Sequence, residues 1–175
     1  MRAAILLGAV VLAGCSSGDE VRMATPAEPR ALELGWVEQS SELGLVFRVH
    51  RLIIRQDGWQ VTASVANRSS ADYAIRWPHH RGKSMFGLVL LKTVRRKELR
   101  ELTADFRKAP PFVEPDQISP PLPSVLWAGT SWRGTMSGSS VLRKGSAVRI
   151  LFGRFDRTRG HPGFLLWITE HAVRL

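Results

Sequence analysis

The chain is poor in cysteine, in lysine and in long apolar segments. Its 175 residues contain one cysteine, Cys15, so no intrachain disulfide can form and any folded part must be held together by its core. The apolar run near the start of the chain, residues 3–13, has eleven residues, whereas a membrane-spanning helix needs about 20. This run is therefore too short to cross a bilayer.

The N-terminal residues have the layout of a secretory signal peptide. Arg2 supplies a minimal positive charge, the apolar run follows, and small residues precede Cys15. The tetrapeptide Leu12-Ala13-Gly14-Cys15 resembles the lipobox of bacterial lipoproteins. The resemblance implies that residues 1–14 are removed, that the Cys15 sulfur carries a diacylglycerol thioether, and that its new amino group is acylated as well. Two or three acyl chains anchor a protein stably, so we expect a membrane-anchored extracytoplasmic protein.

The residue after the lipidated cysteine bears on where the protein is placed. Ser16 stands where enteric lipoproteins that are kept at the inner membrane carry aspartate. The resemblance therefore implies the outer membrane in a cell that has one, and the outer face of the cell membrane in a cell that does not.

Charge divides the chain into an acidic N-terminal part and a basic body. Residues 15–43 carry two basic and six acidic side chains, whereas residues 44–175 carry 22 basic and nine acidic ones. Residues 15–35 begin with Cys15, whose lipidation the lipobox resemblance implies. They contain two prolines and lack apolar periodicity, which predicts a flexible acidic tether after the cysteine. Residues 36–175 then form a single basic domain. Arginine outnumbers lysine by 20 to 5, and the basic surface either binds anionic lipid headgroups or only supports solubility.

Alternating apolar residues predict that this domain is built from β-strands. Leu45–Arg55 and Trp59–Ala66 alternate at period two and are joined by Asp57-Gly58, a strong hairpin signal. Residues 73–77 resume the alternation after the turn-forming residues 67–70 and are expected to form the partner strand of Trp59–Ala66. Further strands are expected over residues 85–91, 131–137, 147–155 and 164–173.

One segment has the spacing of a helix rather than a strand. Apolar residues between Thr93 and Lys108 recur mostly every three or four positions among charged ones, which predicts a short amphipathic helix over about 94–108. A proline-rich connection follows, up to Pro123. Together these elements predict an all-β fold, an immunoglobulin-like β-sandwich of about six to eight antiparallel strands with one inserted helix.

The strand pattern resembles that of the immunoglobulin-like accessory domains of bacterial lipoproteins. The resemblance rests on Val61-x-x-x-Val65-x-Asn67-x-Ser69, and on residues 127–134 and 148–153, which are similar to the closing strands of such domains. The chain lacks the paired cysteines of antibody domains. The resemblance implies a domain that binds, spaces or inhibits, because the fold itself specifies no chemistry.

Motifs for catalysis and cofactor binding are incomplete. Gly82-Lys83-Ser84 matches the end of a P-loop, but Trp77 occupies the position of its first glycine, so no nucleotide is expected. Residues 134–138, Gly-Thr-Met-Ser-Gly, are one position away from the nucleophile elbow of hydrolases. Glu114 and Asp116 lie in the proline-rich connection and are interpreted as loop charges. We expect no enzyme activity and no cofactor, with an envelope hydrolase as the less favoured alternative.

The weak candidates for metal ligands are His79 and His80. Adjacent histidines rarely face one ion, and Arg81 and Lys83 beside them oppose a cation. We therefore expect a solvated loop and no bound metal.

Candidate binding residues are aromatic or basic. Trp127 and Trp132 bracket a turn and, if exposed, would stack on a sugar or a partner protein; the alternative is ordinary core packing. Two basic clusters would bind anionic polymers, or would simply be solvated. They are Arg95, Arg96 and Lys97, and Arg154, Arg157 and Arg159.

The sequence therefore favours a non-catalytic binding or accessory module of the cell envelope. Its expected partners are the membrane, through Cys15, and an envelope protein or an anionic polymer. The alternative is an anion-binding module for wall polymer, lipid headgroups or nucleic acid, whose affinity would fall steeply with salt. An interface with a protein, built on an apolar hot spot, would survive salt.

Overall fold

The computed structural model describes most of the body of the chain. The described residues are 25–76, 85–92, 94–95, 97, 100–101, 112–159 and 164–175. Among the sequence-based predictions, those for Cys15, His79, His80 and Arg96 lie outside these residues. Of the predicted helix, residues 97, 100 and 101 are helical, and most of its remainder lies outside the described residues.

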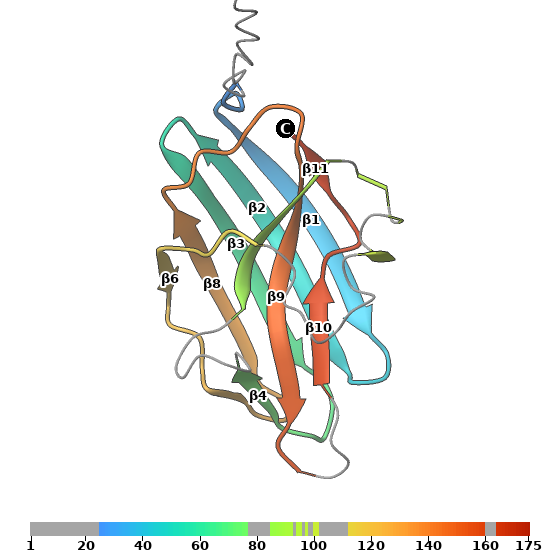
Figure 1. Cartoon of the computed structure of the whole chain (residues 1–175). Helices are drawn as coiled ribbons and strands as arrows, with labels where there is room; N and C mark the ends of the chain where they lie inside the picture. Colours follow the sequence, from blue (N-terminus) through green and yellow to red (C-terminus); the bar gives the residue numbers. More distant parts are fainter. Residues whose placement is uncertain are drawn as a thin grey trace, which may run out of the picture.

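The described residues form two antiparallel β-sheets (Figure 1). In the five-stranded sheet the strand order is β1(Arg30–Ser40), β2(Leu45–Arg55), β3(Gly58–Asn67), β8(Ser131–Gly138) and β6(Gln117–Ser119). In the six-stranded sheet it is β10(Phe164–Ile168), β9(Ala147–Arg157), β4(Tyr73–Arg76) and β7(Val125–Leu126), and β5(Phe86–Leu91) and β11(Val173–Arg174) also pair with β9. The predicted all-β sandwich is thereby confirmed.

Aromatic side chains from both sheets meet at the centre of the core. The ring of Phe47 on β2 stacks on that of Trp167 on β10, with ring centroids 4.8 Å apart. Phe47 also contacts Phe152 and Phe155 of β9, at centroid distances of 5.1 and 5.6 Å. Large aromatic rings bury much apolar area. In a chain with one cysteine, this cluster therefore holds the two sheets together by packing and not by an intrachain disulfide.

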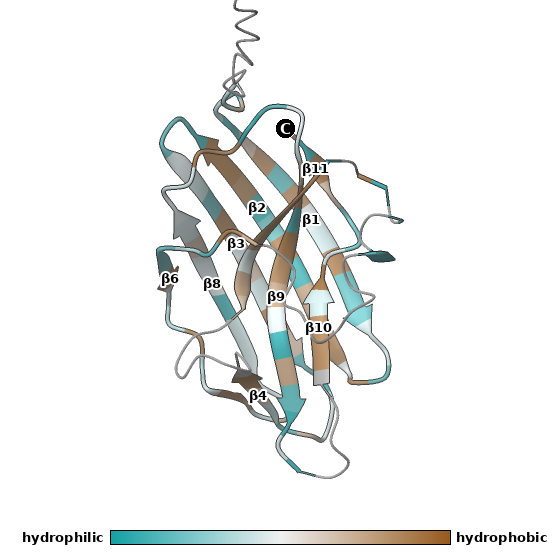
Figure 2. Ribbon diagram, in the orientation of Figure 1, coloured by the Kyte–Doolittle hydropathy of each residue, from teal (hydrophilic) through white to brown (hydrophobic). Residues whose placement is uncertain are grey.

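The six-stranded sheet is buried on its second face as well. A smaller apolar cluster there includes Val89 of β5, Leu151 of β9 and Ile168 of β10, and Phe112 packs against it. Hydrogen bonds in both directions between Leu88 and Val113 hold this segment against β5. β5 is therefore covered on both sides, as its nearly continuous apolar sequence predicts. β9 is hydrophobic over much of its length and becomes hydrophilic toward its Arg157 end (Figure 2).

The folded body begins earlier in the chain than the predicted start of the domain at residue 36. β1 starts at Arg30 and so overlaps the last six residues of the predicted tether. Ala27 is also buried, and its N–H donates to the carbonyl of Leu142 at 2.8 Å. Leu32 and Leu34 alternate with exposed residues and pack against the core, so this stretch has the period of a strand despite its acidic composition.

The predicted pairing of residues 73–77 with Trp59–Ala66 is wrong. β4 belongs to the other sheet, where it pairs with β9 and β7. The physical reason is Asn67, whose side chain is 1% exposed. Its Nδ2 donates to the carbonyls of Ala71 and Leu126, at 2.7 and 3.1 Å, and its Oδ1 accepts from the N–H of Ser69 at 3.0 Å. This buried amide holds a crossing from one sheet to the other in place of a hairpin.

Replacement of Asn67 by alanine tests the role of this crossing. Asn67→Ala removes the side-chain donor of the buried Leu126 carbonyl and the acceptor of the Ser69 N–H, whereas the carbonyl of Ala71 still accepts from the hydroxyl of Ser69. Each such loss costs about 1–3 kcal/mol. We expect the free energy of unfolding, measured by urea denaturation, to fall by about 2–4 kcal/mol. Ser70→Ala, at an exposed position of the same turn, is the control. Equal effects of the two substitutions would contradict the role assigned to Asn67.

Candidate functional site

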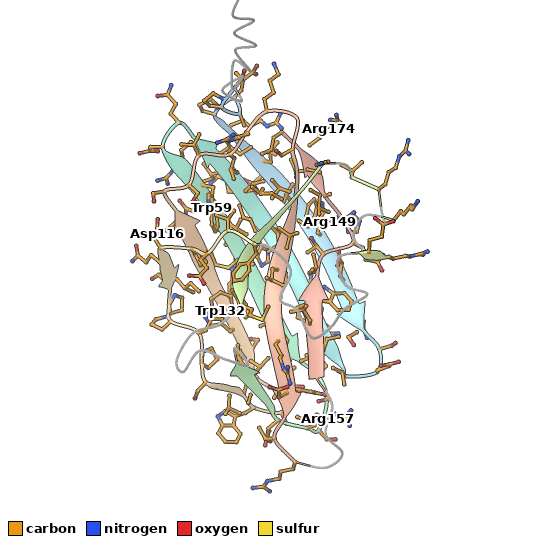
Figure 3. The ribbon with its side chains drawn as sticks, in the orientation of Figure 1. Trp59, Asp116, Trp132, Arg149, Arg157 and Arg174 are labelled. Atoms are coloured by element: carbon orange, nitrogen blue, oxygen red, sulfur yellow. The ribbon has the colours of Figure 1, made fainter. Side chains whose placement is uncertain are left out.

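Four connections of the chain meet at one end of the sandwich. Tyr73, the first residue of β4, pairs with Leu126 of β7 on one side and with Arg157 of β9 on the other. This pairing brings the connection that starts at Trp127 close to the one that follows Arg157. The turn between β1 and β2 lies there too, because the hydroxyl of Tyr73 donates to the carbonyl of Leu43 at 2.8 Å. Figure 3 shows Arg157 at this end and Arg174 at the opposite one.

Asp72 ties two of these connections together. Its Oδ1 accepts from the N–H of Ala128 at 2.8 Å, and its backbone carbonyl accepts from the N–H of Thr158 at 3.0 Å. The turn after β7 is closed by Thr130, whose N–H and hydroxyl both donate to the carbonyl of Trp127. The turn that carries Trp127 is thus fixed by three hydrogen bonds of the backbone and side chains.

This arrangement places an exposed tryptophan, on a hydrogen-bonded turn, at the same end of the sandwich as three exposed arginines. The Trp127 side chain is 58% exposed, although it belongs to the residue type that a fold usually buries. Arg157 and Arg159, at or just after the end of β9, and Arg68, in the crossing after β3, are exposed in connections at the same end of the sandwich. We call Trp127, Arg68, Arg157 and Arg159 the tip site. Tryptophan and arginine are the residue types that dominate binding energy at protein interfaces, so the tip site has the composition of a binding surface.

Trp132, the second tryptophan proposed for binding, belongs to the core. It is 6% exposed, its Nε1 donates to the carbonyl of Pro120 at 3.1 Å, and its ring meets that of Phe86 edge-on. A side chain at Gly134 would come within 2.4 Å of the Trp132 ring, so this glycine makes room for it. Of the two alternatives for these tryptophans, core packing applies to Trp132, and only Trp127 of the pair is exposed.

The other predicted basic residues lie away from the tip site or are already paired. Arg154 is half-buried, and its Nε donates to the Oδ1 of Asp156 at 2.8 Å. Lys97 is exposed, and its Nζ lies 3.9 Å from the Oε1 of Glu101, one helical turn further along the chain. Arg95 is exposed next to Val94, whose carbonyl accepts from the buried Arg149 in the first half of β9. Among the described residues of the two basic clusters, Arg157 and Arg159 lie at the end that carries the tip site.

The near match to a nucleophile elbow has a structural explanation. Residues 134–138 lie within β8, a regular strand, rather than in a strained turn. A side chain at Gly138 would meet the ring of Trp59 at 2.9 Å. Asp116, one of the two acidic residues of the proline-rich connection, accepts from the N–H of Ser139 at 2.6 Å. Hydrogen bonds from Ser139 lower the pKa of the Asp116 carboxyl, as expected for a loop charge that stabilises a strand end.

The structure shows a buried carboxylate at the edge of the sandwich that the sequence does not predict. The side chain of Glu38 on β1 is 7% exposed. Its two oxygens accept from the backbone N–H groups of Glu170 and His171, from Nε1 of Trp167 and from Nδ1 of His171. The His171 ring also stacks on Trp36, with centroids 5.4 Å apart. With four donors on one carboxylate, Glu38 closes the edge between the two sheets and orients His171.

Neither a metal site nor a membrane-spanning helix is found in the described part of the chain. No three histidine, cysteine, aspartate or glutamate side chains gather there in a way that could hold a metal ion. No helix among the described residues combines the length and apolar character needed to span a bilayer. Comparisons with family models, with curated proteins and with solved structures found no match.

Replacement of Glu38 by glutamine tests the closure of the sheet edge. Glu38→Gln turns one acceptor into an NH₂ group that faces N–H donors, so at least one buried donor loses its partner. We expect the free energy of unfolding to fall by about 1–3 kcal/mol in a denaturant titration. Glu33→Gln is the matched control on the same strand, since Glu33 forms only an exposed ion pair with Arg51. An equally small effect at both positions would contradict the assignment.

Proposed function

We propose that the protein is a lipid-anchored, extracytoplasmic, non-catalytic binding protein that presents the tip site to another protein of the cell envelope. The anchor is Cys15, by the lipobox resemblance. The single observation that carries the proposal is the position of the tip site, at the end of the sandwich opposite to the one where the chain enters it.

The chain enters the sandwich beside its C-terminal residues. The carbonyl of Thr25 accepts from the N–H of Lys144, and the N–H of Gly145 donates to the carbonyl of Leu175. From there β9 runs from Ala147 to Arg157, eleven residues or about 33 Å of extended chain. An anchor at Cys15 would therefore hold the end near Thr25 close to the membrane. The tip site would face away from the lipid, where a partner can reach it.

The composition of the tip site favours a protein as the partner. Its charge is mixed, because Glu42 and Asp72 lie among its arginines. Binding at a surface of mixed charge does not depend on charge alone. An exposed tryptophan on a fixed turn supplies apolar contact area with little loss of entropy on binding. Immunoglobulin-like sandwiches also bind through connections gathered at one end, which agrees with the resemblance of the strand pattern.

The anchor is tested by replacing the cysteine. Cys15→Ser removes the sulfur that would accept the lipid, so we expect the variant to leave the membrane fraction. The measurement is fractionation of cells that express each form, together with the intact mass of the purified protein. The unaltered chain should carry the mass of its acyl groups and begin at Cys15. An unmodified mass with retained membrane association would contradict lipid anchoring.

The tip site is tested by replacing its tryptophan. Trp127→Ala should weaken partner capture from detergent-solubilised envelope at least tenfold, since a hot-spot tryptophan contributes about 2 kcal/mol or more. Capture by the unaltered chain should persist at high salt. Val141→Ala is the matched control, because Val141 is also exposed and apolar but lies at the opposite end of the sandwich. Its neighbour Leu142 accepts a hydrogen bond from the N–H of Ala27, where the chain enters the sandwich. Undiminished capture by Trp127→Ala would contradict the proposal.

A further inference from the structure

The outer face of the five-stranded sheet carries a row of three polar side chains across three strands. Arg48 of β2 lies opposite Ser64 of β3, and Ser64 lies opposite Arg133 of β8. Neighbouring strands are about 4.8 Å apart, so the two arginines stand about 10 Å apart at their backbones, with the serine between them. Both guanidinium groups are long enough to reach a ligand placed above Ser64.

A β-bulge adds a fourth side chain to this row. β2 has one extra residue between Val49 and Arg51, and that residue is His50. The Nε2 of His50 lies 3.0 Å from the Oγ of Ser64. Burial lowers the pKa of the His50 imidazole, and the positive charges of Arg133 and Arg48 lower it further. The positive potential of both arginines therefore extends over His50 and the adjacent Ser64.

The positive charge of this row is not compensated by carboxylates among the described residues. Arg48 and Arg133 are exposed, and neither forms an ion pair or a hydrogen bond with another described side chain. The other arginines of the same face have side-chain partners: the Nε of Arg51 lies 2.8 Å from the Oε1 of Glu33, and Arg55 donates to the neutral amide oxygen of Gln60 at 2.6 Å. Two like charges on one row are unfavourable unless something neutralises them.

We propose that Arg48, His50, Ser64 and Arg133 form a binding site for a tetrahedral oxyanion, the phosphate or sulfate group of an extracytoplasmic ligand. The guanidinium groups donate to the oxygens of the anion from both sides, and this planar, multiply donating group is suited to phosphate. The hydroxyl of Ser64 donates from below. The site goes beyond the protein interface proposed for the tip, since it recognises a small charged group on a different face.

Binding at this site is coupled to the protonation of His50. The charged groups around it are Arg48 and Arg51 on its own strand, Glu33 on β1 and Arg133 on β8, while β3 contributes Ser64 and Thr62. In the free protein the arginines disfavour the imidazolium. A bound anion attracts the imidazolium, so binding raises the pKa of His50, and by linkage the anion binds more tightly at pH values below that pKa.

The test is an NMR titration of His50 in the full chain, held in a neutral detergent. Sulfate is the probe because its charge is constant between about pH 5 and 8, and chloride at equal ionic strength is the reference. We expect sulfate to raise the pKa of His50 by about one unit, the lower end of the effect of an opposite charge within about 6 Å. This shift corresponds to binding about tenfold tighter to the protonated form. Equal pKa values in the two salts would overturn the proposal.

Variants separate the site from general screening by salt. In Arg133→Gln, the pKa of His50 in chloride should rise because a repelling charge is removed, and the difference between sulfate and chloride should disappear. Arg48→Gln should behave in the same way. Arg55→Gln, on the same strand and face, should keep the full effect of sulfate. A sulfate effect that persists unchanged in both Arg133→Gln and Arg48→Gln would overturn the assignment.

The natural source of the anion is separated by two further probes. Short-chain polyphosphate represents a charged polymer, and glycerol phosphate represents a lipid headgroup. The probe whose binding is lost in Arg133→Gln represents the source that the site recognises. If Arg133→Gln binds both probes as well as the unaltered chain does, the proposal is contradicted. Trp127→Ala should retain binding of both probes, so failure of the tip site and failure of this site are told apart.

Discussion

The side-chain amide of Asn67 is the interaction on which the arrangement of the protein depends. Its hydrogen bonds to Ala71 and Leu126 turn the chain out of the five-stranded sheet and into the other one. As a result Tyr73 enters between Leu126 and Arg157, and the connections that carry Trp127 and Arg159 come together. A hairpin at the same place would leave β4 in the first sheet and would not assemble a tip site. One buried polar group thus links the topology to the proposed interface.

The sequence predicts those features that depend on local patterns. The hairpin of β2 and β3 follows from period-two alternation on both sides of Asp57-Gly58, and the bounds of β2 agree with the structure residue for residue. The turn after β3 is also predicted, but turn-forming residues do not specify which sheet receives the next strand. Trp127 and Trp132 have the same chemistry, but Trp132 packs in the core, where Gly134 leaves space for its ring, whereas Trp127 lies exposed on a turn.

Other features have no local signal because their partners are far apart in the chain. Glu38 binds groups near residue 170, and no pattern around it distinguishes a buried carboxylate from the solvated acids of the N-terminal part. The row of Arg48, Ser64 and Arg133 depends on the register of three strands and on a one-residue bulge. The alternation of arginines along β2 marks a polar outer face in retrospect. It does not reveal which of those arginines lack a carboxylate partner.

The proposed function requires that the tip site contacts a partner protein in the envelope. The most direct measurement is photo-crosslinking in intact cells from a light-activated amino acid placed at position 127, with position 141 at the other end of the sandwich as the reference. We expect a discrete adduct with a second protein from position 127 and none from position 141. Adducts of equal yield from both positions, or adducts with lipid alone from position 127, would contradict it.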